Sequence, residues 1–558
     1  MLEDFDLTAI HDLEGARQAI ARLLNLVEDL ASDLREAQAE IQRLRDENNR
    51  LKGEQGQPQI KANKKPEAGA TPRDYSSESE RKKPRARRKK GSKVAQLHID
   101  REVTLTVDRA TLPPDAEFKG HEPVVIQDLQ IKTDNILFHK EKFYSATTRQ
   151  TYLAALPKGY TGAFGPNVKA WTLVLYFGLQ TSEPKLVEFL HTVGLQISPA
   201  QVSDWLIHDQ ARFHAEKVAV YEAGLRSSPY QQIDDTGVCV NGQNQHCHIV
   251  CNLLYTAYLT TDKKDRLSVI DVLRNLAPRA YVLNAETTRF LERLRLPQPL
   301  LARLLQLPQE QVLDETAFLA LLQTHLPELG PQQRTHILDA AAVAAYHQQL
   351  DFPVMEVLVC DDAPQFKFIT AYLSLCWVHD GRHYKKLTPV VALHQQLLTA
   401  FLARYWAYYR KLRDYQAHPM PEQVTPLRQE FDALFSTQTG YAALDERIAK
   451  TLAKKESLLL VLHHPELPLH NNEAELGARA VVRKRDVSLG PRTPAGRKAW
   501  DTFLTLRETA RKLDVNFYAY LRDRVTGENL LPSLAELIQA QAERLRLNAS
   551  WQATNASP

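Results

Sequence analysis

The first part of the chain carries an apolar repeat with the spacing of a coiled coil. Apolar residues between 13 and 51 fall on the a and d positions of a seven-residue repeat, with charged residues between them. The a positions are Leu13, Ile20, Val27, Leu34, Ile41 and Asn48, and the d positions are Ala16, Leu23, Leu30, Ala37, Leu44 and Leu51. Branched residues at a with Leu at d favour a two-stranded parallel pair, and a lone Asn at a fixes its register. We predict a coiled-coil oligomerisation helix over 1–55; the alternative is a helix that packs on its own domain.

Apolar residues then almost vanish, and Pro, Glu, Ser and Lys dominate the next stretch of the chain. Such a segment cannot bury enough surface to fold alone, so we predict a basic disordered linker over 56–97. Its cations gather at one end and are suited to phosphate backbones, which they bind without sequence preference. The predicted DNA-binding residues here are Arg81, Lys82, Lys83, Arg85, Arg87, Arg88, Lys89 and Lys90. The alternative is a linker that only increases solubility.

Two further segments precede the main domain. Alternation at 103–107 and an apolar run at 124–126 predict a small β-rich domain over 98–165. Residues 166–225 are helical by pattern, with a turn at Gly194 and a helix start at Ser198-Pro199. A helix pair around a glycine turn is compatible with a helix-turn-helix DNA-binding region and equally with ordinary packed helices.

The largest domain is predicted over 226–525. Residues 230–261 alternate in the manner of three strands, and the continuous apolar run at 357–359 suits a strand buried on both faces. Two helical stretches, at about 286–350 and 389–462, interrupt this pattern and are interpreted as insertions. Strands with intervening helices predict an α/β layer fold. A C-terminal helix and tail complete the chain over 526–558.

Composition narrows the classes of protein. The chain has 558 residues, 44% of them hydrophobic, and a formal net charge of +3, so we expect several ordinary globular domains. No stretch approaches the about 18 uncharged apolar residues of a membrane helix, which predicts a soluble cytoplasmic protein. Five cysteines without a CxxC pair favour reduced thiols, and His246-Cys247-His248 is interpreted as strand positions in preference to a metal cluster.

Three short stretches each supply a carboxylate near the end of a predicted element. Asp234-Asp235 lies in the first strand of the main domain, Asp361-Asp362 follows the strand at 357–359, and Glu475 lies in a helix opened by Asn471 and Asn472. A strand turns successive side chains to opposite faces, so only one of Asp234 and Asp235 can face a common site. Glu475 is either a site residue or a helix cap, since its spacing from Asn472 is that of a capping box.

Clustered carboxylates repel one another, and divalent cations relieve this repulsion. Carboxylate oxygens suit Mg²⁺, and two Mg²⁺ ions, for which Mn²⁺ could substitute, can activate a hydroxyl and stabilise a leaving oxygen in phosphoryl transfer. A basic stretch follows the third acid and is predicted to hold DNA, with Trp500 as a platform for an unpaired base; the alternative is a solvated basic face. Its predicted DNA-binding residues are Asn471, Arg479, Arg483, Lys484, Arg485, Arg492 and Arg497.

These motifs resemble the bacterial insertion-sequence DDE transposases of the IS66 type. Asp234-Asp235-Thr236 resembles the family's Asp-Glu-Thr, and Asp361 resembles its second acid. The segment from Cys376 to His379 resembles Cys-Trp-x-His, and that from Asn471 to Glu475 resembles Asn-Asn-x-x-Glu. The resemblance implies an RNase H-like catalytic domain in which Asp234, Asp361 and Glu475 are the catalytic metal ligands. It also implies double-stranded DNA, at element ends and targets, as the partner, with small accessory proteins beside it.

The chain departs from the family pattern in three places. No cysteine precedes Cys239, so the usual zinc module before the catalytic domain is absent. His470 and Leu476 stand where the family has Asp and Arg. The leading hypothesis is a metal-dependent transposase that cleaves element ends and joins them to target DNA. Its rivals are a catalytically inactive DNA-binding protein derived from a transposase, a coiled-coil scaffold, and a hydrolytic nuclease that cuts without joining.

Overall fold

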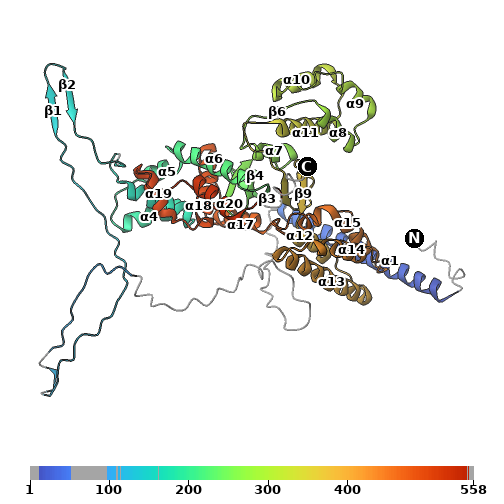
Figure 1. Cartoon of the computed structure of the whole chain (residues 1–558), viewed down its shortest axis with the longest axis horizontal. Helices are drawn as coiled ribbons and strands as arrows, with labels where there is room; N and C mark the ends of the chain where they lie inside the picture. Colours follow the sequence, from blue (N-terminus) through green and yellow to red (C-terminus); the bar gives the residue numbers. More distant parts are fainter. Residues whose placement is uncertain are drawn as a thin grey trace.

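A mixed five-stranded sheet forms the centre of the protein (Figure 1). The computed structural model describes residues 12–51, 97–108, 111–113, 115–160, 162–548 and 551. The strands lie in the order β5-β4-β3-β8-β9, and all run in one direction except β4, which is antiparallel to both of its neighbours. Their bounds are Tyr230–Val240 for β3, Gln243–Cys251 for β4, Thr256–Thr261 for β5, Val357–Cys360 for β8 and Tyr372–Leu375 for β9.

Local sequence explains the strands. Asn241 and Gly242 both have positive φ, 49° and 77°, which is the conformation that a tight turn between antiparallel strands requires. Every residue of β8 is buried, in agreement with the continuous apolar run from which the strand was predicted. The three predicted strands of 230–261 correspond to β3, β4 and β5. The structure is therefore a mixed α/β fold, as the sequence predicted at this coarser level.

Helices cover both faces of the sheet. One face, with Ile249 and Tyr258, packs against α17 and α18. The other face, with Ile233 and Val250, belongs to a larger apolar cluster that α6 and α7 join. The bounds are Ala211–Arg226 for α6, Arg266–Leu273 for α7, Asn472–Ser488 for α17 and Pro494–Lys512 for α18.

The first insertion lies between α7 and β8 and is mainly helical, as predicted. A short two-stranded pairing, Ala280–Tyr281 (β6) with Leu313–Asp314 (β7), holds its base. Its helices are Ala285–Arg293 (α8), Gln298–Leu304 (α9), Glu315–His325 (α10) and Pro331–Gln348 (α11). Figure 1 shows it as a separate lobe beside the sheet.

The second insertion joins α12 to α17 and packs around Trp377. The Trp377 indole donates to Leu458 O at 2.9 Å, and its ring contacts Tyr405, Tyr408 and Phe431. The helices are Trp377–Lys385 (α12), Ala392–Ala417 (α13), Val424–Phe435 (α14), Ala442–Leu452 (α15) and Lys455–Leu458 (α16). Short 3-10 turns lie at Pro364–Phe366 (η5), Pro421–Gln423 (η6) and Leu460–Leu462 (η7).

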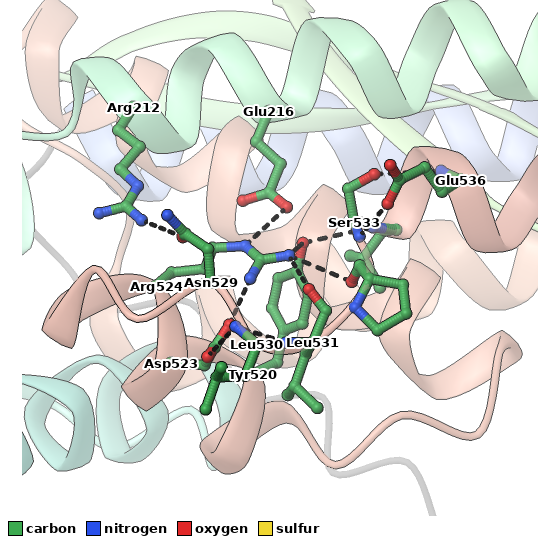
Figure 2. A network of polar contacts seen from close by, with 12 residues as sticks. Arg212, Glu216, Tyr520, Asp523, Arg524, Asn529, Leu530, Leu531, Ser533 and Glu536 are labelled. Carbon is green, nitrogen blue, oxygen red and sulfur yellow. Dashed lines mark hydrogen bonds and ion pairs between the residues drawn. The ribbon is translucent and has the colours of Figure 1, made fainter.

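Helices from before and after the sheet pack together at its other end. They are Pro166–Leu173 (α3), Glu183–Thr192 (α4), Pro199–Ile207 (α5), Phe517–Thr526 (α19) and Leu534–Leu545 (α20), with a π-helical turn at Val174–Gly178 (η4). Figure 2 shows how Arg524 of α19 connects α6 with the segment ahead of α20: its guanidinium lies 3.6 Å from Glu216 of α6 and donates to Leu531 O and Pro532 O.

The predicted helix pair is present as α4 and α5, joined through Gly194 at φ +91°. Ser198 caps α5 by accepting a hydrogen bond from the Gln201 amide at 3.2 Å. The apolar sides of both helices are buried in the main core. The binding of DNA by this helix pair stays a prediction.

The small β-rich domain predicted for 98–165 is not formed in the described residues. Only one hairpin occurs there, Lys142–Ser145 (β1) with Gln150–Leu153 (β2), and it stands apart from the core in Figure 1. Residues 103–107 and 124–126 have no strand, and Leu105 and Ile126 are 85% and 82% exposed. Alternation alone does not make a strand, because a strand needs a partner to accept its backbone hydrogen bonds.

The N-terminal helix α1 (Leu13–Leu51) lies along the second insertion. Glu28 accepts hydrogen bonds from the amides of Val390 and Val391, at 3.0 and 2.8 Å, just ahead of α13. Asn25 exchanges hydrogen bonds with Gly440 O and the Ala442 amide, and Arg35 donates to Thr388 O. These anchors occupy b and f positions, while the apolar a and d side chains from Leu13 to Leu51 stay exposed. Packing on its own domain, the alternative from the sequence, therefore occurs through residues of α1 that leave its large a and d side chains exposed.

No helix among the described residues is both long enough and apolar enough to cross a membrane.

Candidate active site

Asp234 and Asp361 lie side by side on neighbouring strands. Strands β3 and β8 are parallel, and Gln232 is paired with Val359. Asp234 lies two residues after Gln232, and Asp361 lies two residues after Val359. The parallel register therefore places the two aspartates next to each other across β3 and β8. Asp361 follows the last residue of β8, and η5 then turns the chain away. The pair lies at the carboxyl end of β8, the edge at which α/β sheets hold ligands.

The two adjacent aspartates of β3 face opposite sides of the sheet. Asp234 is paired with Ile249 of β4, and Ile249 packs against Ala474 of α17. Directly paired residues share a face, so Asp234 lies on the side that α17 covers. Asp235 lies on the other side, where Lys264 donates to its carboxylate at 3.3 Å. The structure thus selects Asp234 as the one that faces Glu475.

Glu475 comes to this face from the first turn of α17. The amide of Glu473 donates to the Gln232 side chain at 3.2 Å, which fixes the start of the helix beside β3. Glu473 itself pairs with Lys512 at 3.2 Å. Asn471 is the N-cap residue, and its side chain makes no capping hydrogen bond. The Glu475 carboxylate is directed to α12, so the interpretation of Glu475 as a helix cap is wrong.

Two residues of α12 hold the Glu475 carboxylate. Oε1 lies 3.1 Å from Arg382 Nη2 and 3.4 Å from His379 Nε2. Arg382 also donates to His379 at 2.7 Å. No group in the described part of the chain donates a well-aligned hydrogen bond to Glu475 Oε1, although the side chain is only 12% exposed. This oxygen therefore has an ion-pair partner but no well-aligned hydrogen bond, which leaves it under-satisfied.

The electrostatics of the site favour a bound cation. Burial raises the pKa of Asp234 to about 7, the charges of Glu475, Asp235 and Asp361 add to the rise, and a hydrogen bond from the Asp235 amide opposes it. The rise shows that Asp234 is shielded from water and lies near other negative charges. A positive charge placed among them would remove the repulsion.

The donor set fits hard divalent ions, although the side chains as placed do not enclose one. Asp234, Asp361 and Glu475 would supply carboxylate oxygens, the ligands that Mg²⁺ prefers. Among the residues that the structure describes, no three His, Cys, Asp or Glu side chains converge closely enough to hold one ion. Glu475 is held instead by Arg382. Binding a cation would therefore require Glu475 to exchange the guanidinium for the ion.

The predicted DNA-binding residues around α17 divide into two groups. Arg479, Arg483 and Arg492 are exposed. Arg485 donates to Gly237 O at 2.6 Å, and Arg497 donates to Gln245 at 3.1 Å, so both are held by the sheet. The residues predicted at 81–90 lie outside the described part of the chain.

Two of the predicted DNA-binding residues and one aromatic are buried, which corrects the prediction. Lys484 is fully buried and donates to the carbonyls of Tyr176 and Thr181 at 3.0 and 3.3 Å. Burial lowers the pKa of Lys484 to about 7, with Arg507 adding to the effect. Asn471 and Trp500 are 1% and 5% exposed. None of the three can contact DNA in this conformation.

His379 and Arg382 were not predicted as site residues. His379 belongs to the Cys-Trp-x-His segment, and Arg382 follows one helical turn later on the same side of α12. This spacing is the feature of the sequence from which their common position could have been predicted. Their contact with Glu475 crosses from α12 to α17, and no local pattern reports such a contact.

Comparisons with known proteins support one family. The model of the family described as Transposase IS66 family matches residues 341–499, which include Asp361 and Glu475. A protein of Sinorhizobium fredii (strain NBRC 101917 / NGR234), "Uncharacterized protein y4jO", is 33% identical over 322 residues, which are 57% of this chain and 99% of that protein. No solved structure matches the chain. The chain covers this relative almost in full, and the family match includes both Asp361 and Glu475. The chain belongs to the IS66 transposase family.

Proposed function

We propose that the protein is a DNA transposase of the DDE type, which cleaves DNA at the ends of a mobile element and joins them to target DNA. The observation that carries the proposal is that Asp234, Asp361 and Glu475 lie on one face of the sheet, near enough for the charges of Glu475 and Asp361 to act on Asp234. The mixed sheet with acids on its central strand, after the next strand and on a later helix supports an RNase H-like catalytic fold.

The three carboxylates would hold two Mg²⁺ ions, or Mn²⁺ in their place. When bound, the ions supply charge stabilisation for the attacking and leaving oxygens of a phosphodiester. The chain's own residues supply position: β3 and β8 fix the two aspartates, and α17 carries Glu475. Arg382, once released from Glu475, would lie beside these acids and could contact a phosphate oxygen of the bound strand.

The experiment that tests the joining reaction uses labelled DNA with candidate element ends and an unlabelled supercoiled plasmid. We expect the label to become covalently attached to the plasmid in the presence of Mg²⁺. Cleavage without attachment would identify a hydrolytic nuclease and contradict the proposed strand transfer. Heat-denatured protein and a reaction in EDTA are the controls.

We expect the exposed arginines after Glu475 to bind DNA through phosphates. The double substitution Arg483→Ala and Arg492→Ala should weaken DNA binding about tenfold at physiological salt and lower the salt slope of log K by about two. Lys484→Met is the matched control on the same helix, because Lys484 is buried and should leave the slope unchanged. Fluorescence anisotropy over a range of salt concentrations measures both. An equal loss in Lys484→Met, or no change of slope in the double variant, would contradict this assignment.

One observation favours a second candidate function, a DNA-binding protein without catalysis. The Arg382–Glu475 ion pair neutralises the third acid without a metal. This alternative predicts DNA binding that is indifferent to Mg²⁺ and to substitution of any of the three acids. We propose a homo-oligomer through α1 and small accessory proteins as partners for either function.

A further inference from the structure

A cavity of about 560 Å³ lies beside the segment that follows β8. It is formed where the first insertion, the segment after β8, strand β9 and α16 meet. Asp362 lines it, and Asp362 immediately follows Asp361. A cavity of this volume is within the range of small-ligand sites. Leu373 and Leu375 of the lining are paired with Leu358 and Cys360, so the cavity opens on the sheet face opposite to Asp234, and it meets the carboxylates only at the end of β8, where Asp362 follows Asp361.

The cavity has an excess of positive charge. Four cations line it, Arg289, Arg293, Lys367 and Lys454, against the carboxylates of Glu286 and Asp362. Both carboxylates are already neutralised: Asp362 pairs with Lys367 and Lys454 at 3.2 and 2.6 Å, and Glu286 contacts His347 at 2.5 Å. The two arginines therefore remain as the excess.

Arg289 and Arg293 lie one turn apart on the same side of α8. Arg289 donates its Nε to Ala285 O, and the Arg293 guanidinium lies over the Phe368 ring at 4.2 Å from the centroid. Neither has an acidic partner in the part of the chain that the structure describes. A pair of guanidinium groups without carboxylate partners in the lining of a cavity is suited to a phosphate group.

Part of the lining is apolar and aromatic. Phe290 and Phe368 contact edge to face with 5.1 Å between ring centroids, and Leu373 and Leu375 extend this wall. Phe368 has φ +68°, a strained backbone conformation for a bulky residue that persists only where its surroundings impose it. Aromatic rings beside a phosphate-binding pair of arginines suit the base or sugar of a nucleotide.

We propose that this cavity binds one nucleotide of the DNA strand that is engaged at the three carboxylates. Its phosphate lies between Arg289 and Arg293, and its base or sugar lies against Phe368. The inference rests on the proposed function, because it takes the strand at the carboxylates as the source of the nucleotide. A free nucleotide has the same chemistry and is the competing source.

Photocrosslinking of the full-length protein tests the proposal without depending on catalysis. The probe is an oligonucleotide duplex with a single-stranded end that carries 4-thiothymidine, irradiated in EDTA, and crosslinked peptides are identified by mass spectrometry. We expect crosslinks in residues 286–293 or 367–373 and at least a tenfold loss of them in Arg289→Gln/Arg293→Gln. Arg303→Gln, on α9 outside the cavity, is the matched control and should crosslink like the wild type.

The possible outcomes separate this proposal from the proposed function. Crosslinks only in other peptides, or undiminished crosslinks in the double variant, would overturn the cavity assignment even if the protein cleaves DNA. Crosslinks in the cavity with no cleavage would support the cavity and count against the transposase. Crosslinking of 4-thiothymidine monophosphate in the cavity, with none from the duplex, would assign the cavity to a free nucleotide and overturn the DNA assignment. A circular dichroism melt of each variant confirms that folding is intact.

Discussion

Replacement of Asp234 by Asn should lower the rate of DNA strand cleavage by at least about 10³-fold, equivalent to about 4 kcal/mol in the activation barrier. The reason is that Asp234 is the proposed ligand on the central strand, beside Asp361 and on the face that Glu475 shares. An amide keeps the shape of the side chain but removes the negative charge that a cation requires. The rate is measured with end-labelled duplex DNA in Mg²⁺, and DNA affinity is measured in EDTA, where it should stay within about threefold of the wild type.

Asp235→Asn is the matched control for this substitution. The two aspartates are adjacent in sequence, equal in chemistry and on opposite faces of β3. Asp235 contacts Lys264 and not the other acids of the proposed site, so its variant should retain cleavage within about tenfold. Equal losses of cleavage in both variants would indicate damage to the strand. A loss of cleavage only in Asp235→Asn would place the site on the face of β3 opposite to the proposed one.

Self-association through α1 gives the second large effect. Leu30→Glu together with Leu34→Glu should convert an oligomer into a monomer and weaken association by about 10⁴-fold. Two leucines from each of two helices would lose burial worth about 1.5 kcal/mol or more each, which is about 6 kcal/mol in all. The anchors Asn25, Glu28 and Arg35 fix the polar side of the helix to its own second insertion, so the exposed a and d side chains are left for a second copy.

Sedimentation velocity over a range of protein concentrations measures this association. Arg22→Glu is the control, because Arg22 is exposed at a c position and introduces the same carboxylate outside the apolar seam. A wild-type protein that is monomeric at all concentrations would contradict pairing through α1. So would an oligomer that is unaffected by the two Leu→Glu substitutions.

Periodicity in the sequence predicted the main-domain elements well because most of them are buried on a regular side. The residues of β8 are all buried, and β3 to β5 alternate against two helical layers. The same pattern misled at 103–107, because alternation describes one strand and does not supply a partner. For α1 the structure shows packing within the chain through Asn25, Glu28 and Arg35, and pairing of two copies through the exposed a and d side chains stays a prediction.

The charge of a residue predicted its exposure less well than its position in the helical repeat did. Lys484 was grouped with its arginine neighbours, but Gly477, Val481 and Lys484 form the buried side of α17. That helical spacing was visible in the sequence, and it predicts the burial of Lys484 better than the charge of Lys484 predicts exposure. The role of Arg382 at Glu475 and the cavity beyond Asp362 depend on contacts between α12, α17 and the two insertions. Such long-range contacts leave no local pattern.

Metal-dependent nicking of labelled DNA by the wild type beside Asp361→Ala tests the central claim most directly. The wild type should nick DNA that carries candidate element ends in Mg²⁺ or Mn²⁺ and not in EDTA. Asp361→Ala should bind the same DNA without nicking it. Metal-dependent nicking that persists in Asp361→Ala would contradict the assignment of the site. The absence of nicking in both proteins, with DNA binding intact, would contradict the catalytic proposal and favour a DNA-binding protein without catalysis.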